Sequence, residues 1–114
     1  MVSQQDQQLL NQAQVYQQQI QNVLAQKETL NMQLLEVNKA LDEMEKSKEE
    51  NVYKASGPIL IKSSKNEVKK ELMEKKELIE TRIKTLERSE KTLQSKIEEL
   101  REKLIKASKG AEAG

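Results

Sequence analysis

The stretch NVYKASGPILIKS, residues 51–63, decides the fold. Two β-prone runs, 51–55 and 59–63, flank the turn cluster SGP at 56–58, which holds the only proline of the chain. Two such runs around a Gly-Pro turn predict a β-hairpin. The segment ILI at 59–61 is apolar on both faces of its strand, and a lone two-stranded hairpin is marginal in water. Because no other stretch reads as a strand, we expect the hairpin to find its partners in other subunits.

A heptad repeat lies on either side of the hairpin. Residues 4–49 contain no glycine or proline, and their apolar positions alternate in steps of four and three, as they do again over 67–108. This spacing has a period of 3.5 residues and predicts left-handed coiled-coil packing along an apolar seam. The predicted seam positions are Leu9, Ala13, Tyr16, Ile20, Val23, Lys27, Leu30, Leu34, Val37, Leu41 and Met44, followed by Leu72, Lys76, Ile79, Ile83, Leu86, Glu90, Leu93, Ile97, Leu100, Leu104 and Ala107.

Capping signals set the expected ends of the two helices. Ser3 has the position of an N-cap for the first helix, and Ser64 with Glu67 forms a capping box for the second. Gly110 is expected to stop the second helix. We therefore predict one mainly α domain, a long antiparallel two-helix coiled-coil hairpin with one β-hairpin at the bend. It spans residues 1–114, with helix over 4–49, a β-hairpin over 51–63, helix over 65–109 and a flexible tail over 110–114.

Two polar residues interrupt the seam at matching heights. If the helices pair about the bend, opposed seam positions have residue numbers that sum to 116 or 117, and Lys27 and Glu90 fit this rule. One interpretation is that both residues tolerate a partly exposed seam. The other is a cross-helix ion pair that helps to fix the register of the coil. A half-heptad slip of the register would separate the two residues.

The composition argues against an enzyme. The chain of 114 residues has no histidine and no cysteine, so the usual zinc sites and nucleophile–base pairs are ruled out. Its three glycines form no phosphate-binding loop. Twenty basic and nineteen acidic residues are interleaved, which favours neither nucleic acid nor an anionic membrane. We expect no catalytic residues, no metal and no cofactor. With no apolar run of spanning length and no signal-peptide pattern, a cytoplasmic location is the default.

The far ends of the two predicted helices have an unusual surface. Twelve of residues 1–33 are glutamine, and only Asp6, Lys27 and Glu28 are charged there. Two apolar residues, Leu10 and Ile105, lie off the seam near the free ends. These features fit either a neutral solvated face with a widened seam, or an adaptable apolar patch that binds varied ligands.

The central block resembles the β-class subunit of the prefoldin family. The pattern V-Y-K-x-x-G-x-I-L-I-K-x-x-K-x-x-V-x-x-E-L lies between two heptad helices, and the pattern around Tyr16, Ile20, Val23 and Lys27 is also similar. The resemblance covers nearly the whole chain, and one β-hairpin instead of two points to the β class. The residues that carry the central pattern are Val52, Tyr53, Lys54, Gly57, Ile59, Leu60, Ile61, Lys62, Lys65, Val68, Glu71 and Leu72.

The resemblance implies an ATP-independent chaperone subunit of archaeal type. It implies a hexamer with two prefoldin alpha subunits and four beta subunits, in which the β-hairpins build a body of β-barrels. It also implies that the ends of the coiled coils bind unfolded client proteins, prevent their aggregation and deliver them to a group II chaperonin. The expected assembly residues are Val52, Tyr53, Ile59, Leu60 and Ile61. The candidates for the client-binding tip are Leu9, Leu10, Ala13, Leu104, Ile105 and Ala107.

Three other interpretations stay open at the level of sequence. A structural coiled-coil scaffold or spacer without chaperone activity would account for the helices but leave the apolar hairpin without a purpose. An enzyme or its regulatory subunit conflicts with the missing chemistry. A self-assembling prefoldin-like filament or homo-oligomer is the third, and it is compatible with the sequence.

Overall fold

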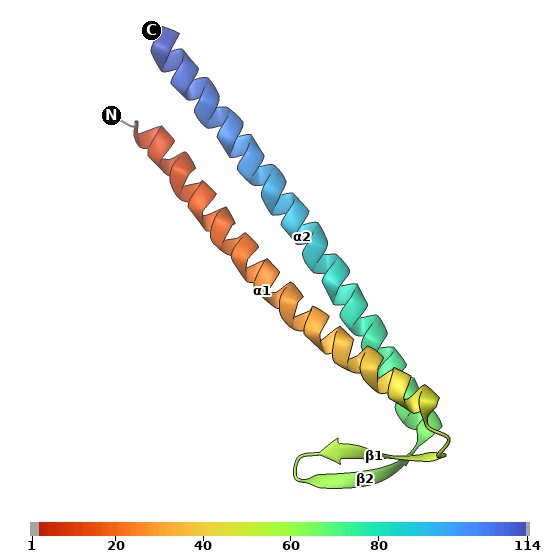
Figure 1. Ribbon diagram of the computed structural model, residues 1–114. Helices are drawn as coiled ribbons and strands as arrows, with labels where there is room; N and C mark the ends of the chain where they lie inside the picture. The colour runs from red at the N-terminus through yellow and green to blue at the C-terminus, as the bar shows by residue number, and fades with distance from the viewer. Residues whose placement is uncertain (1–2, 114) are drawn as a thin grey trace. The chain divides into compact units, whose positions relative to one another are not determined.

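The computed structural model describes residues 3–113 and consists of two long helices with a β-hairpin between them in the chain (Figure 1). Helix α1 spans Gln4–Lys46 and helix α2 spans Lys65–Ala113. Strands β1, Asn51–Ser56, and β2, Ile59–Ser64, pair antiparallel in a two-stranded sheet. The predicted mainly α fold class, with one β-hairpin between two heptad helices, is therefore confirmed. Assembly of the hairpin into an oligomeric barrel stays a prediction.

Helix α1 begins where its cap predicts but ends three residues early. The backbone N–H of Asp6 donates to Oγ of Ser3 at 3.0 Å, which is the predicted N-cap. The helix was expected to reach residue 49 but ends at Lys46. There the hydroxyl of Ser47 accepts a hydrogen bond from the backbone N–H of Glu49 at 3.3 Å. Local bonds of this kind compete with the helical ladder, and sequence spacing does not reveal them.

Lys65, the first residue of α2, makes two hydrogen bonds with the residues that connect α1 to β1. Its Nζ donates to the backbone carbonyl of Ser47 at 2.6 Å, and its backbone N–H donates to the carbonyl of Glu50 at 2.8 Å. The side chain thus satisfies a carbonyl just past the end of α1, and a cation is favourable at a helix C-terminus. One residue at the start of α2 therefore fixes how α1 leads into β1.

Helix α2 starts at its capping box but runs through the expected stop. The backbone N–H of Glu67 donates to Oγ of Ser64 at 3.2 Å. The helix then continues to Ala113, so its predicted end at 109 and the predicted tail over 110–114 are wrong for residues 110–113, while residue 114 lies outside the described part. Among the described residues only Gly57 has a positive φ, so Gly110 keeps a helical backbone instead of the left-handed one that ends helices. Glycine inside a helix costs only about 1 kcal/mol relative to alanine, which the helix tolerates.

The heptad positions are the buried positions. All eleven predicted seam residues of α1 are buried or half-buried, including the polar Lys27. In α2 the same holds from Leu72 to Leu104, whereas Ala107 is exposed, so the seam ends one position earlier than predicted. The most buried apolar side chains are Ile20, Val37, Met44, Ile79, Leu93 and Leu100.

The hairpin register follows from a two-residue turn. Ser56 pairs with Ile59, and the pairing continues to Asn51 with Ser64. Gly57 has φ of +57°, which suits the first central position of a type II′ turn, and the ring of Pro58 presets the second. Tyr53 and Leu60 therefore lie on one face of the hairpin, and Ile59 and Ile61 lie on the other.

The chain divides into two compact units, each containing part of both helices. The hairpin unit comprises residues 28–84 and includes both strands. In it, Lys69 pairs with Glu45 at 2.6 Å, and Lys54 of β1 pairs with Glu71 of α2 at 2.7 Å. The terminal unit comprises the described residues up to Lys27 and from Thr85 onward.

Candidate functional site

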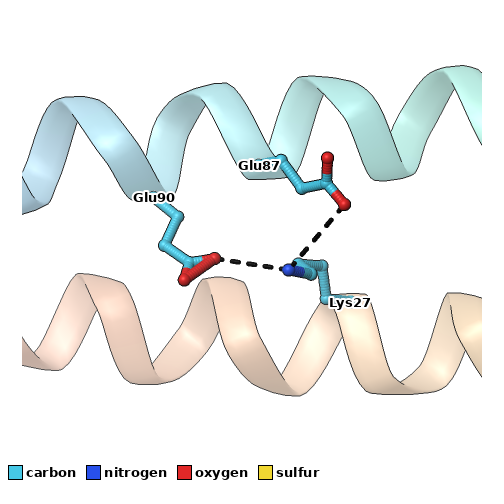
Figure 2. A network of polar contacts seen from close by, with 3 residues as sticks. All are labelled: Lys27, Glu87 and Glu90. Carbon is cyan, nitrogen blue, oxygen red and sulfur yellow. Dashed lines mark hydrogen bonds and ion pairs between the residues drawn. The ribbon is translucent and has the colours of Figure 1, made fainter.

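A polar layer closes the seam of the terminal unit at Lys27. Its Nζ lies 3.4 Å from Oε2 of Glu90 and 3.9 Å from Oε1 of Glu87, and Figure 2 shows the lysine reaching from α1 between the two α2 carboxylates. The side chains of Lys27 and Glu90 are 23% and 20% exposed, whereas that of Glu87 is 51% exposed. The structure thus brings Lys27 and Glu90 together, and Glu90 is the better shielded partner.

A second contact across the same unit involves an aromatic ring. Nζ of Lys96 lies 5.6 Å from the centroid of the Tyr16 ring, within the range of a cation–π interaction. Tyr16 is half-buried on the seam, and the Lys96 ammonium lies over the face of its ring. From Lys27 to Tyr16 the residue numbers fall on α1, while those of their partners rise from Glu90 to Lys96, so the helices of the terminal unit run antiparallel.

An apolar groove lies between the helices of the terminal unit, beyond the Tyr16 layer toward the chain ends. Its volume is about 400 Å³, within the usual size of ligand sites. Alanine occupies the seam position at 13, and its methyl side chain takes less space there than the leucine or isoleucine found at most other seam positions. The groove, called here the inter-helix groove, is lined by Ala13, Gln17, Ile97, Arg101, Leu104, Ile105 and Ser108.

Three of the six predicted tip residues line this groove. Ala13, Leu104 and Ile105 contribute to its wall, and the Ile105 side chain is 47% exposed. Leu9, Leu10 and Ala107 do not line it: Leu9 is half-buried on the seam, and the other two are exposed, Leu10 by 40%. The client-binding role of these six residues stays a prediction.

Sequence reasoning missed four residues that line the groove. The heptad pattern predicts Ile97 only as a seam residue, and it predicts no role for Gln17, Arg101 or Ser108. The signal that could have found them is helical spacing, because positions 97, 101, 104, 105 and 108 recur on one face of a helix. The groove is formed by two helices far apart in sequence, so spacing within one helix reveals only one wall.

The hairpin carries a second apolar surface. Tyr53, Ile59, Leu60 and Ile61 are exposed by 67%, 59%, 70% and 45%, whereas Val52 is half-buried. Both faces of the two-stranded sheet therefore present large apolar side chains to solvent in the single chain. Contiguous exposed apolar patches of this kind mark interaction surfaces. The predicted assembly residues lie together, although their role in assembly is not tested by the single chain.

Over positions 3–113, no cluster of three or more acidic side chains is arranged to hold a metal ion. Neither helix, as far as it is described, has an apolar window long enough to cross a bilayer. What the arrangement offers is binding surface, namely an apolar groove in one unit and an apolar hairpin in the other.

Comparisons with known proteins agree on one family. Residues 7–111 match the family described as prefoldin subunit. The prefoldin subunit beta of Archaeoglobus fulgidus is 46% identical over 99 residues, which cover 86% of this chain and 85% of that protein. The prefoldin subunit beta of Thermococcus onnurineus is 43% identical over 97 residues, 84% of either chain. The crystal structure of the prefoldin beta subunit from Thermococcus strain KS-1 superposes with a TM-score of 0.87 at 40% identity, covering 94% of this chain and 95% of that one.

Proposed function

Since the chain belongs to the prefoldin subunit family, a chaperone family whose beta subunits it resembles over most of its length, we propose that it captures unfolded proteins and prevents their aggregation. The observation that carries this proposal is the inter-helix groove in the unit formed by both ends of the chain. Unfolded proteins expose apolar side chains, and an apolar groove removes such side chains from water. Four of its seven lining residues are apolar, and Arg101 is the only charged one among them, which suits the binding of apolar side chains.

The apolar hairpin is the proposed assembly surface. Burying Tyr53, Ile59, Leu60 and Ile61 against strands of other subunits would remove exposed apolar area and satisfy open strand edges. The partner is a prefoldin alpha subunit, in a hexamer of two alpha and four beta subunits with a barrel-like body. Both faces of the hairpin carry apolar groups, so each hairpin can bind neighbours on two sides.

Multiple grooves in one hexamer account for firm but reversible capture. Each groove of about 400 Å³ holds only a few side chains, so a single contact is weak. Several linked weak contacts raise the overall affinity, while each contact still dissociates quickly. We propose that clients are held in this way without ATP and handed to a group II chaperonin in the cytoplasm.

An aggregation-suppression assay tests the proposal. Light scattering of a chemically unfolded client, diluted with the chain alone and with the chain plus an alpha subunit, is expected to fall most with the assembled complex. A scaffold protein would leave scattering unchanged in both cases. Native mass measurement of the same mixture shows whether a species of hexamer size forms, which separates failed assembly from failed capture.

Trimming the chain ends locates the capture site. Removal of residues 1–10 and 105–114 deletes Ile105 and Ser108 from the groove but leaves the hairpin intact. We expect the trimmed chain to assemble normally and to suppress aggregation several-fold less well. Full activity of an assembled trimmed chain would refute the assignment of the client site to the ends.

A further inference from the structure

We infer that the inter-helix groove binds client segments as amphipathic helices that carry an acidic residue beside their apolar stripe, and not as extended chains. This inference rests on the proposed function and names the class of segment that the groove selects. The α2 wall runs from Ile97 to Ser108, twelve residues that span roughly 16 Å of helix. That length matches about three turns of a ligand helix or about five residues of an extended strand.

Backbone hydrogen bonding favours the helix. Both walls of the groove are α-helices whose backbone N–H and C=O groups bond within the helix. Only three side chains of the lining, Gln17, Arg101 and Ser108, have polar ends. An extended segment lying on these walls would turn backbone groups toward a surface with few partners for them. A helical segment satisfies its own backbone and presents only side chains.

The groove is continuous with the seam of the coil, so a ligand helix would pack there as a third helix. Ala13, Ile97 and Leu104 are half-buried seam residues that also line the groove. An apolar ligand side chain can enter the space above Ala13, and its neighbours one and two turns away contact Leu104 and Ile105. Apolar residues at i, i+4 and i+7 of the ligand supply these contacts.

A charged residue on the rim of the groove determines which side chain is preferred beside the apolar stripe of the ligand helix. The α1 side is neutral at Gln17, whereas Arg101 on the α2 side is 69% exposed. Its partner in the chain, Glu98, lies at 3.9 Å and is itself 61% exposed, so the pair is weak. The guanidinium is therefore open to a ligand carboxylate, which it can bind in a bidentate manner.

Matched peptides test this inference on the assembled complex of the full chain with an alpha subunit. The probe is a fluorescein-labelled peptide of four turns with leucine at i, i+4, i+7 and i+11 and glutamate beside this stripe. One comparison peptide has the same composition with its leucines at alternating positions. Two others differ from the probe by a central proline or by lysine in place of glutamate. In fluorescence anisotropy we expect the first peptide to bind about tenfold tighter than the alternating and proline peptides, and about threefold tighter than the lysine peptide.

Variants of the chain locate the binding. Ala13→Leu fills the groove and is expected to weaken binding of the first peptide about tenfold. Ala25→Leu makes the same change at an exposed position of α1 and is expected to leave the binding of this peptide unchanged. Arg101→Gln is expected to remove the preference for glutamate over lysine. Circular dichroism checks that helical content is kept in each variant.

The outcomes separate this inference from the proposed function. Equal binding of the helical, alternating and proline peptides overturns the helical selection, even if aggregation is still suppressed. Binding that Ala13→Leu leaves intact overturns the groove as the site. Absence of aggregation suppression by the assembled complex would instead remove the proposed function itself.

Discussion

Nζ of Lys27 on α1 lies 3.4 Å from Oε2 of Glu90 on α2, at the layer where both heptad repeats lack an apolar residue. Both side chains are less than a quarter exposed. A polar pair in an otherwise apolar seam lowers stability in exchange for one preferred alignment, because slipped alignments leave a charge without its partner. We propose that this pair fixes the register of the terminal unit.

Replacement of both residues by leucine tests the register role. Lys27→Leu with Glu90→Leu makes this layer of the seam apolar and is expected to raise the free energy of unfolding by about 1 to 3 kcal/mol. It is also expected to permit other registers or helix-mediated oligomers, visible as extra species in light scattering and as mixed cross-links between cysteines introduced into each helix. The natural chain has no cysteine, so the cross-links report only the chosen pair. A single unchanged register and mass would contradict the idea.

Single substitutions show how much Glu90 and Glu87 each contribute to stability through Lys27. Glu90→Gln is expected to destabilise the chain by about 1 kcal/mol, because it leaves the partly buried Lys27 ammonium without its nearer partner. Glu87→Gln is expected to lower the free energy of unfolding by only a few tenths of a kcal/mol. The Glu87 side chain is half exposed, and its Oε1 lies 3.9 Å from Nζ of Lys27. Urea unfolding followed by circular dichroism measures both. Equal costs would mean that Lys27 divides its interaction evenly between the two acids.

Charge placed on the hairpin tests assembly. Ile59→Lys or Ile61→Lys puts an ammonium on a surface that the complex is proposed to bury, so the hexamer is expected to dissociate while helical content stays. Leu35→Lys is the control, because Leu35 is an exposed residue of α1, 71% accessible and outside the hairpin. Native mass spectrometry with an alpha subunit distinguishes the variants. An intact hexamer with lysine at both isoleucine positions would place the assembly surface elsewhere.

Replacement of Gly57 and of Gly110 by alanine is expected to change stability in opposite directions. Gly57 has φ of +57° with no atom within 4 Å of an added Cβ, so Gly57→Ala is expected to destabilise the hairpin by about 1 kcal/mol through the backbone alone. Gly110 lies in α2, also with open space around it, and Gly110→Ala is expected to stabilise the helix by about 0.5 to 1 kcal/mol. The urea concentration at which half of the complex has dissociated tests the effect of Gly57→Ala. The helical content of the chain tests the effect of Gly110→Ala.

The sequence predicted those features that depend on local period or local turn chemistry. The seam residues are buried because a 3.5-residue spacing places them on one face of a helix, and this includes Lys27. The hairpin follows from a Gly-Pro turn whose glycine has the required positive φ. Both results rest on neighbours in the chain, which a sequence displays directly.

Features that depend on distant residues were not predicted. The early end of α1 coincides with contacts from Lys65 to Ser47 and Glu50, and no local signal gives these. The continuation through Gly110 shows that a glycine stops a helix only when its backbone turns left-handed. Arg101 and Ser108 became part of the candidate site only when α1 supplied the facing wall with Ala13 and Gln17.

The pair of Glu45 and Lys69 gives the hairpin unit a weak response to acid. The hydrogen bond from Lys69, and then its charge, holds the pKa of the Glu45 carboxyl below its usual value. A carboxyl with a lowered pKa in the folded state contributes stability above its unfolded pKa, and that contribution is lost as the pH falls through the folded value. Because both groups are well exposed, the effect is small and screened by salt.

Melting temperatures measured against pH test this pair. Relative to the natural chain, Lys69→Gln is expected to melt slightly lower near pH 7, and the difference is expected to vanish as the pH falls through the lowered pKa of Glu45 and its carboxylate becomes protonated. Lys70→Gln is the matched control, because Lys70 is the next residue of α2, also exposed, and makes no pair with Glu45. The difference should also shrink in about 1 M salt, where the Debye length is about 3 Å. A difference that persists at low pH would show that Lys69 acts through packing of its stem and not through the Glu45 carboxylate.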